Sequence, residues 1–144
     1  MSEAIVVGTD GSDTAKRAVA EAVRLASALG AEIHLVSAYE RARAVHAASP
    51  GGQQVPPMVD DGMVESKLSE AAASVRAADV SVKTHAVRKE PADALLEVAD
   101  EVGADLIVVG NQGMHGAKRV LGSVPNSVSH KARCNVLIVS TDAP

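Results

Sequence analysis

Residues 4–12 read AIVVGTDGS, an apolar run that ends in a glycine-containing turn. A short continuous apolar run bounded by turn residues is typical of a strand buried on both faces, as in parallel sheets. Apolar residues then recur at helical spacing over 15–29, with Ser12 as candidate N-cap and Gly30 as the stop. Residues 33–39 return to strand character. This stretch therefore predicts a β-α-β unit with a right-handed crossover, the beginning of a parallel sheet.

Strand and helix patterns alternate along the rest of the chain, which predicts an α/β, doubly wound fold. The strand over 80–87 carries alternating polar side chains and is expected at an edge of the sheet. Residues 40–62 have no sustained period and contain Pro and Gly, so they are expected to form a loop. The further predicted helices cover 64–75, 91–102 and 123–132, and the further predicted strands cover 105–109 and 136–139. We expect one domain over 1–144.

Composition excludes several classes of function. The chain has 144 residues, one Tyr and no Phe or Trp, so bases have no aromatic platforms to stack on. A net charge of −4 also opposes binding to a phosphate backbone, and we expect no nucleic-acid partner. Apolar runs are too short for a membrane span and the N-terminus has no signal-peptide pattern, so a cytoplasmic location is expected. A single cysteine, Cys134, fits a reducing compartment.

A ligand site is expected beyond the carboxyl ends of the strands, where the winding of an open parallel sheet reverses. The loop over 110–122 is rich in glycine and directly precedes Ser123 and a helix. Glycines allow close backbone approach, and a helix N-terminus presents unpaired N–H groups to phosphate. These glycines could equally be ordinary loop punctuation. The two standard fingerprints, for dinucleotides and for the P-loop, are absent from the sequence.

Several candidate residues have two interpretations. Asp10 follows the first strand, where a carboxylate can hold ribose hydroxyls or can merely cap the turn or the next helix. Ser123 can contact phosphate, serve as the N-cap of its helix, or do both. The histidines His34, His46, His85 and His130 are too scattered along the sequence for a metal-binding spacing, so we predict no metal site.

Five segments taken together resemble the universal stress protein family, of the single-domain, nucleotide-binding kind, over essentially the whole chain. They are IVVGTDGS at 5–12, ADLIVVG at 104–110, Gly110-x-x-Gly113, LGSV at 121–124 and VLIV at 136–139. The resemblance implies a Rossmann-like open five-stranded parallel sheet, in strand order 3-2-1-4-5 with helices on both faces. It further implies ATP held between the ends of the first and fourth strands, and a homodimer formed through the last strand, residues 135–141.

Residue by residue, the resemblance implies that the Asp10 carboxylate and the Thr9 backbone line the adenosine end, and that the backbone of Ala38 reads the adenine edge. Val109 and Gly110 would flank the ribose and phosphates. The complete nucleotide-binding set that it implies is Gly8, Thr9, Asp10, Ala38, Val109, Gly110, Gly113, Gly122, Ser123 and Val124. One departure affects the phosphate end, because the family pattern has nine residues between its second and third glycines and this chain has one fewer between Gly113 and Gly122.

The expected function is that of a stress-response regulator that binds an adenine nucleotide. ATP, with or without Mg²⁺, is the first expectation, and AMP and cyclic AMP are the alternatives. Phosphoryl transfer would need carboxylates to hold Mg²⁺, and the phosphate loop offers only His115, Lys118 and Arg119. We therefore expect no enzyme activity beyond very slow ATP hydrolysis. The rival classes are an adenine-nucleotide α-hydrolase-like enzyme and a scaffold that binds no nucleotide.

Overall fold

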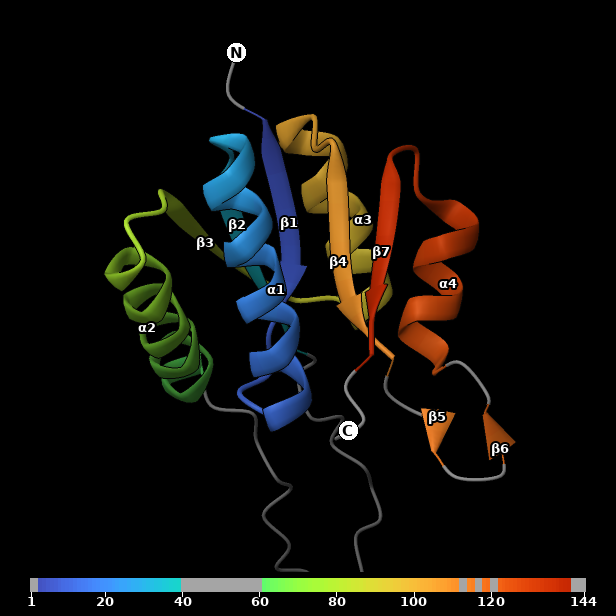
Figure 1. The fold of residues 1–144 in the computed structure, drawn as a ribbon. Coiled ribbons are helices and arrows are strands. Elements are labelled where there is room, and N and C mark those ends of the chain that lie inside the picture. The colour runs from blue at the N-terminus through green and yellow to red at the C-terminus, as the bar shows by residue number, and fades with distance from the viewer. Residues whose placement is uncertain (1–2, 40–60, 112–113, 116–117, 120–121, 141–144) are drawn as a thin grey trace, which may run out of the picture.

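Five parallel strands form the central sheet, in the order β3-β2-β1-β4-β7 (Figure 1). The structure is a computed structural model that describes residues 3–39, 61–111, 114–115, 118–119 and 122–140. β1 lies at the centre between β2 and β4, so the winding reverses between β1 and β4. The strands are β1 (Ala4–Gly8), β2 (Glu32–Ala38), β3 (Val82–Val87), β4 (Leu106–Gly110) and β7 (Asn135–Val139).

The four helices of the described residues cover the sheet, α1 and α2 on one face and α3 and α4 on the other (Figure 1). Local sequence explains where they begin and end. The Ser12 side chain accepts a hydrogen bond from the Ala15 amide at the start of α1, and Gly30 ends that helix in the left-handed conformation. Pro91 opens α3 and a left-handed Gly103 closes it. The helices are α1 (Asp13–Leu29), α2 (Asp61–Ala77), α3 (Pro91–Val102) and α4 (Ser123–Lys131).

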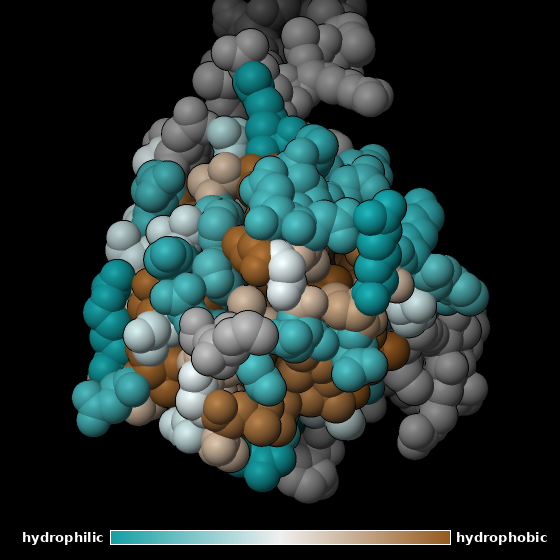
Figure 2. Space-filling model, turned by 90° about the horizontal axis from the view of Figure 1, so that it is seen from above, coloured by the Kyte–Doolittle hydropathy of each residue, from teal (hydrophilic) through white to brown (hydrophobic). Residues whose placement is uncertain are grey.

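Two apolar layers make the core, one on each face of the sheet. The first joins β1 and β2 to α1 and α2, with Leu35 and Leu68 almost fully buried. The second joins β2 and β4 to α3 and α4, with Ile107 and Val128 almost fully buried. Burial is less complete elsewhere, since hydrophobic residues are visible between hydrophilic ones on the end of the molecule seen from above (Figure 2). In the edge strand β7, residues 136–139 are only half-buried.

The expected fold class and strand order are confirmed by this sheet, in which β7 takes the place of the fifth strand. The edge position expected for residues 80–87 is also confirmed by β3. A short antiparallel pair, β5 (Met114–His115) with β6 (Lys118–Arg119), lies within the stretch expected to be an irregular loop. None of the helices in the described residues is long and apolar enough to cross a bilayer.

Candidate nucleotide site

A pocket opens at the carboxyl ends of β1 and β4, where the winding of the sheet reverses. It lies against the α3 and α4 face of the sheet and reaches the first turn of α1. In open α/β folds this is the place where ligands bind, because loops on both sides diverge from the strand ends. The structure therefore has a pocket at the position expected from the sequence.

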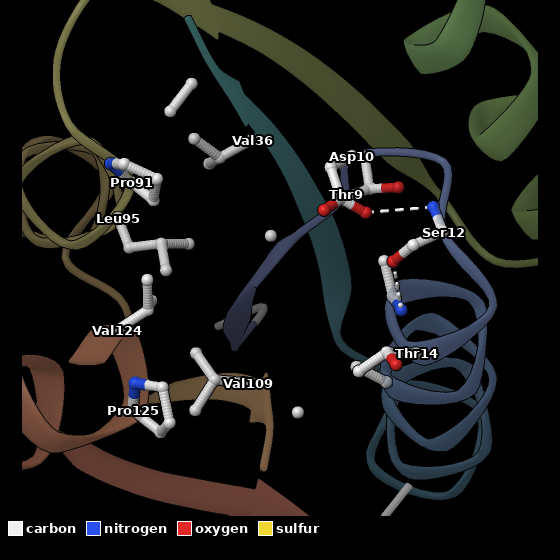
Figure 3. Close-up of a pocket in the computed structure, with 15 residues that line it drawn as sticks. Thr9, Asp10, Ser12, Thr14, Val36, Pro91, Leu95, Val109, Val124 and Pro125 are labelled. Carbon is white, nitrogen blue, oxygen red and sulfur yellow. Dashed lines mark hydrogen bonds between the residues drawn. The ribbon is translucent and has the colours of Figure 1, made fainter. Parts of the chain in front are cut away.

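One wall of the pocket is apolar (Figure 3). Val36 comes from β2, Pro91 and Leu95 come from α3, and Val124 and Pro125 come from α4. Gly8 at the end of β1 lets α3 approach closely, because a Cβ there would come within 3.3 Å of Leu95 Cδ2. This wall offers a flat apolar ligand group, such as a purine ring, contact without polar groups to desolvate.

The opposite wall is polar and comes from the turn between β1 and α1 (Figure 3). Asp10 Oδ1 accepts a hydrogen bond of 2.8 Å from the Ser12 amide, so the turn-capping interpretation of Asp10 is observed. Asp10 remains exposed and lines the pocket, together with the half-buried hydroxyl residues Ser12 and Thr14. A carboxylate beside two hydroxyls can bind the hydroxyl groups of a sugar.

The backbone amide of Thr9 already has a hydrogen-bond partner within the sheet. This amide donates a 2.8 Å hydrogen bond to the Val36 carbonyl, continuing the pairing of β1 with β2. The Thr9 side-chain Oγ1 faces the Gly11 amide at 3.4 Å. Gly11 has a positive φ of 82°, a conformation that favours glycine and makes the tight turn possible. Thr9 thus lines the pocket while its amide is already satisfied.

Most residues implied by the resemblance are brought together here. The pocket lining includes Gly8, Thr9, Asp10, Ala38, Val109, Gly110 and Val124. Gly122 and Ser123 directly precede Val124 at the start of α4 and are not part of that lining, and Gly113 lies outside the described residues. The pocket has further lining residues that the sequence did not predict, namely Ser12, Thr14, Ala15, Ala18, Val36, Pro91, Leu95 and Pro125. Alternation along β2 could have found Val36, which lies two residues before Ala38 on the same face.

The start of α4 differs from one expectation. Gly122, not Ser123, is the N-cap, and no side chain caps the helix. Ser123 is the first helical residue, so its hydroxyl is not used for capping and the N-cap interpretation of Ser123 is wrong. Pro125, the third residue, has no N–H. The unpaired amides that this helix presents near the pocket are therefore those of Ser123 and Val124.

The described cavity has a volume of about 150 Å³. Complete small-molecule sites usually measure roughly 300–1,000 Å³. The cavity that the described residues enclose is therefore smaller than a complete small-molecule site.

No group of three or more His, Cys, Asp and Glu side chains is placed to hold a metal ion among the described residues. Cys134 directly precedes β7, and burial raises the pKa of its thiol above the ordinary value. A thiol with a raised pKa is protonated at neutral pH and is a poor nucleophile. The cysteine is therefore a packing residue.

Comparisons with known proteins agree with this architecture. A model of the universal stress protein family matches residues 1–140. A universal stress protein of Mycobacterium tuberculosis is 40% identical over 142 residues, which cover 95% of each chain. Another, from Bacillus subtilis, is 34% identical over 147 residues, covering 96% of this chain and 99% of the relative.

Solved structures extend the comparison to ligands. A universal stress protein in complex with cyclic AMP superposes with a TM-score of 0.76 at 38% identity, covering 98% of both chains. A universal stress protein of Archaeoglobus fulgidus in complex with dAMP superposes with a TM-score of 0.70 at 27% identity, covering 94% of this chain and 96% of the other. Sequence, topology and the location of the pocket agree, and the chain belongs to the universal stress protein family.

Proposed function

We propose that this protein binds an adenine nucleotide in the pocket between β1 and β4 and acts as a nucleotide-dependent regulator in the stress response. The observation that carries the proposal is the two-sided pocket, with an apolar wall for the base and a carboxylate and hydroxyls opposite for the ribose. Its position at the reversal of the sheet winding and the cyclic AMP and dAMP complexes of related proteins support it.

ATP is the nucleotide that the sequence motifs favour, and cyclic AMP is the second candidate. The described pocket lining supports the second, because it contains no Lys or Arg and its only charged residue is Asp10. A neutral or acidic lining suits a ligand with one phosphate charge better than a triphosphate, whose charges need cations. Triphosphate binding would have to rely on the amides of Ser123 and Val124 and on the segment that carries Lys118 and Arg119.

Calorimetric titration with ATP, AMP, cyclic AMP and GTP tests the function and the choice of nucleotide. We expect saturable binding of at least one adenine nucleotide and much weaker binding of GTP, because the guanine edge differs in its hydrogen-bonding groups. Mass spectrometry of small molecules released from freshly purified, denatured protein gives an independent answer. Absence of binding by all three adenine nucleotides, with none released, would leave the scaffold alternative.

Turnover is expected to be far below that of ordinary enzymes. The described lining offers one carboxylate, Asp10, where catalysis of phosphoryl transfer needs carboxylate ligands for Mg²⁺ and a cationic clamp. Phosphate release from ATP with Mg²⁺ present should therefore stay well under the usual enzyme range of about 1–10³ per second. A rate of tens per second would show that the segment between β4 and α4 supplies catalytic groups.

A further inference from the structure

Two histidines that lie far apart in the sequence meet between β2 and the edge strand β3. His34 Nδ1 lies 3.0 Å from His85 Nε2, and the ring centroids are 5.2 Å apart. His34 Nε2 lies 3.1 Å from Glu32 Oε1 on the same strand. These contacts form a chain from Glu32 through His34 to His85. We call His34 and His85 the histidine pair.

The carboxylate determines which ring nitrogens carry protons. Glu32 can only accept, so His34 must donate from Nε2. A neutral imidazole has one N–H, which leaves His34 Nδ1 as an acceptor. His85 must then donate from its Nε2 across the 3.0 Å contact. With both rings neutral, the pair forms a directed hydrogen bond that joins β3 to β2.

The hydrogen bond between the two rings can persist when one proton is added to the pair, but not when two are added. A first proton can go to Nδ1 of His85, which makes no hydrogen bond among the described residues, and the bond to His34 survives. A second proton can only go to His34 Nδ1, the atom that accepts that bond. Two N–H groups would then face each other, and two cationic rings would lie side by side. Full protonation therefore removes the bond between the strands and replaces it with repulsion.

The surroundings oppose charge on the pair. His34 is almost completely buried, with 6% of its side chain exposed. The facing charged groups are Glu32 from β2, Lys83 from β3 and Glu101 from α3. Burial lowers the pKa of both histidines below the ordinary 6.5, and Lys83 lowers both further, while Glu32 opposes this at His34 and Glu101 at His85. Lowered values keep the bond intact at neutral pH.

The pair sits beside the candidate nucleotide site. His85 is the register partner of Val36, and Val87 is the register partner of Ala38; Val36 and Ala38 both line the pocket. Just beyond β2, the Tyr39 amide donates a 3.0 Å hydrogen bond to the Val87 carbonyl. Being an edge strand, β3 is held within the sheet by β2 alone. Loss of the bond between the histidines would loosen the strand that fixes the end of β2.

We propose that the histidine pair is an acid-sensitive clamp, which holds β3 on β2 at neutral pH and weakens nucleotide binding when both rings are protonated. The second part rests on the proposed function, whereas the first does not. The direction of the pH dependence of stability follows from the lowered pKa values of both histidines. The folded protein takes up protons on these rings less readily than the unfolded chain, so stability is full above about pH 6.5 and falls as the pH drops through the lowered pKa values.

The first test measures the protons taken up on unfolding. Urea unfolding is followed between about pH 7.5 and pH 5.5, which brackets the ordinary histidine pKa. The pair is expected to contribute an uptake of up to about two protons in the wild type. His85→Gln keeps a donor for His34 and does not titrate, so it should retain stability at neutral pH and take up about one proton fewer. His130→Gln, on the exposed surface of α4, is the matched control and should behave like the wild type.

Two further measurements report directly on the histidine pair and on β3. Nitrogen NMR should find both rings protonated at Nε2 at neutral pH, and the His34 Nδ1 signal should be shifted by hydrogen bonding. This measurement uses the wild type, so it does not depend on how well a variant folds. Hydrogen exchange should show that the protection factors of β3 amides fall on acidification in the wild type and not in His85→Gln. Equal proton uptake by the wild type and His85→Gln, or the opposite tautomer at His34, would overturn the clamp.

The coupling between the histidine pair and nucleotide binding is tested by calorimetry with cyclic AMP and ATP, at about pH 7.5 and about pH 5.5. The affinity of the wild type should fall by about fivefold or more relative to His85→Gln, the lower bound of ordinary coupling between sites. Because both proteins bind the same nucleotide, comparing the wild type with His85→Gln cancels any effect of protonation of the nucleotide itself. Equal falls in both proteins would overturn the coupling. If no adenine nucleotide binds even at neutral pH, the proposed function and the coupling fail together, and proton uptake still decides whether the clamp exists.

Discussion

Replacing Gly122 with Glu should abolish nucleotide binding while the domain stays folded. Gly122 caps α4, and the first-turn amides of Ser123 and Val124 lie beside the pocket. A carboxylate there would face the ligand phosphate with like charge. At about 4 Å and an effective dielectric constant of about 20, that repulsion is on the order of 4 kcal/mol. This is roughly a thousandfold loss of affinity, which calorimetry can measure.

The neutral variant Gly122→Gln separates charge from bulk, because its side chain has nearly the same shape. We expect Gly122→Gln to bind far more tightly than Gly122→Glu. Both variants should unfold at about the wild-type urea concentration, since the backbone of Gly122 has a φ of −61° that other residues adopt readily. Wild-type affinity in Gly122→Glu would place the phosphates away from α4.

We propose a homodimer formed through β7, and we expect it to separate into monomers when Leu137 is changed to Lys and Val139 to Asp. β7 is an edge strand, and its residues 136–139 are apolar and only half-buried. It has no Lys, Pro or bulge to prevent pairing, so two copies can pair antiparallel about a two-fold axis. The mass measured by light scattering should fall to the 14.7 kDa of one chain.

Leu137 and Val139 also pack against the core, so a second variant guards against simple unfolding. The Val139 carbonyl accepts a bond from the Asn111 amide, and its backbone therefore faces the sheet. By alternation the backbone of Ile138 faces outward. Ile138→Pro removes an outward N–H without breaking the pairing with β4. A dimer mass in both variants would place the interface elsewhere.

Local signals in the sequence were sufficient to predict most of the fold. Ser12, Gly30, Pro91 and Gly103 end or begin helices through their own backbone and side-chain chemistry, and the structure has each in that role. The strand order came from the family resemblance, because pairing between strands that are distant in sequence has no local sequence signal. The exception is burial, since a strand at an edge of the sheet carries more polar side chains. The half-polar pattern of residues 80–87 was such a signal, and it placed β3 correctly at an edge.

The candidate site was less predictable, for physical reasons. Ser123 was expected as a possible N-cap because serine favours that position, yet the chain enters the helix one residue earlier, at Gly122. His34 and His85 are 51 residues apart in the sequence, and whether such residues meet across neighbouring strands depends on the register of those strands. Once β2 and β3 are known to be parallel neighbours, the pairing of His85 with Val36 puts it one diagonal step from His34.

Tyr39 gives the protein a built-in optical reporter. It is the only aromatic residue among Phe, Trp and Tyr in the chain, so all intrinsic ultraviolet fluorescence comes from this one side chain. Its side chain packs against the core layer of α1 and α2, and its amide donates a hydrogen bond to the Val87 carbonyl on β3. Emission from unlabelled protein can therefore follow the detachment of the edge strand, in real time and without background from any other aromatic side chain in the chain.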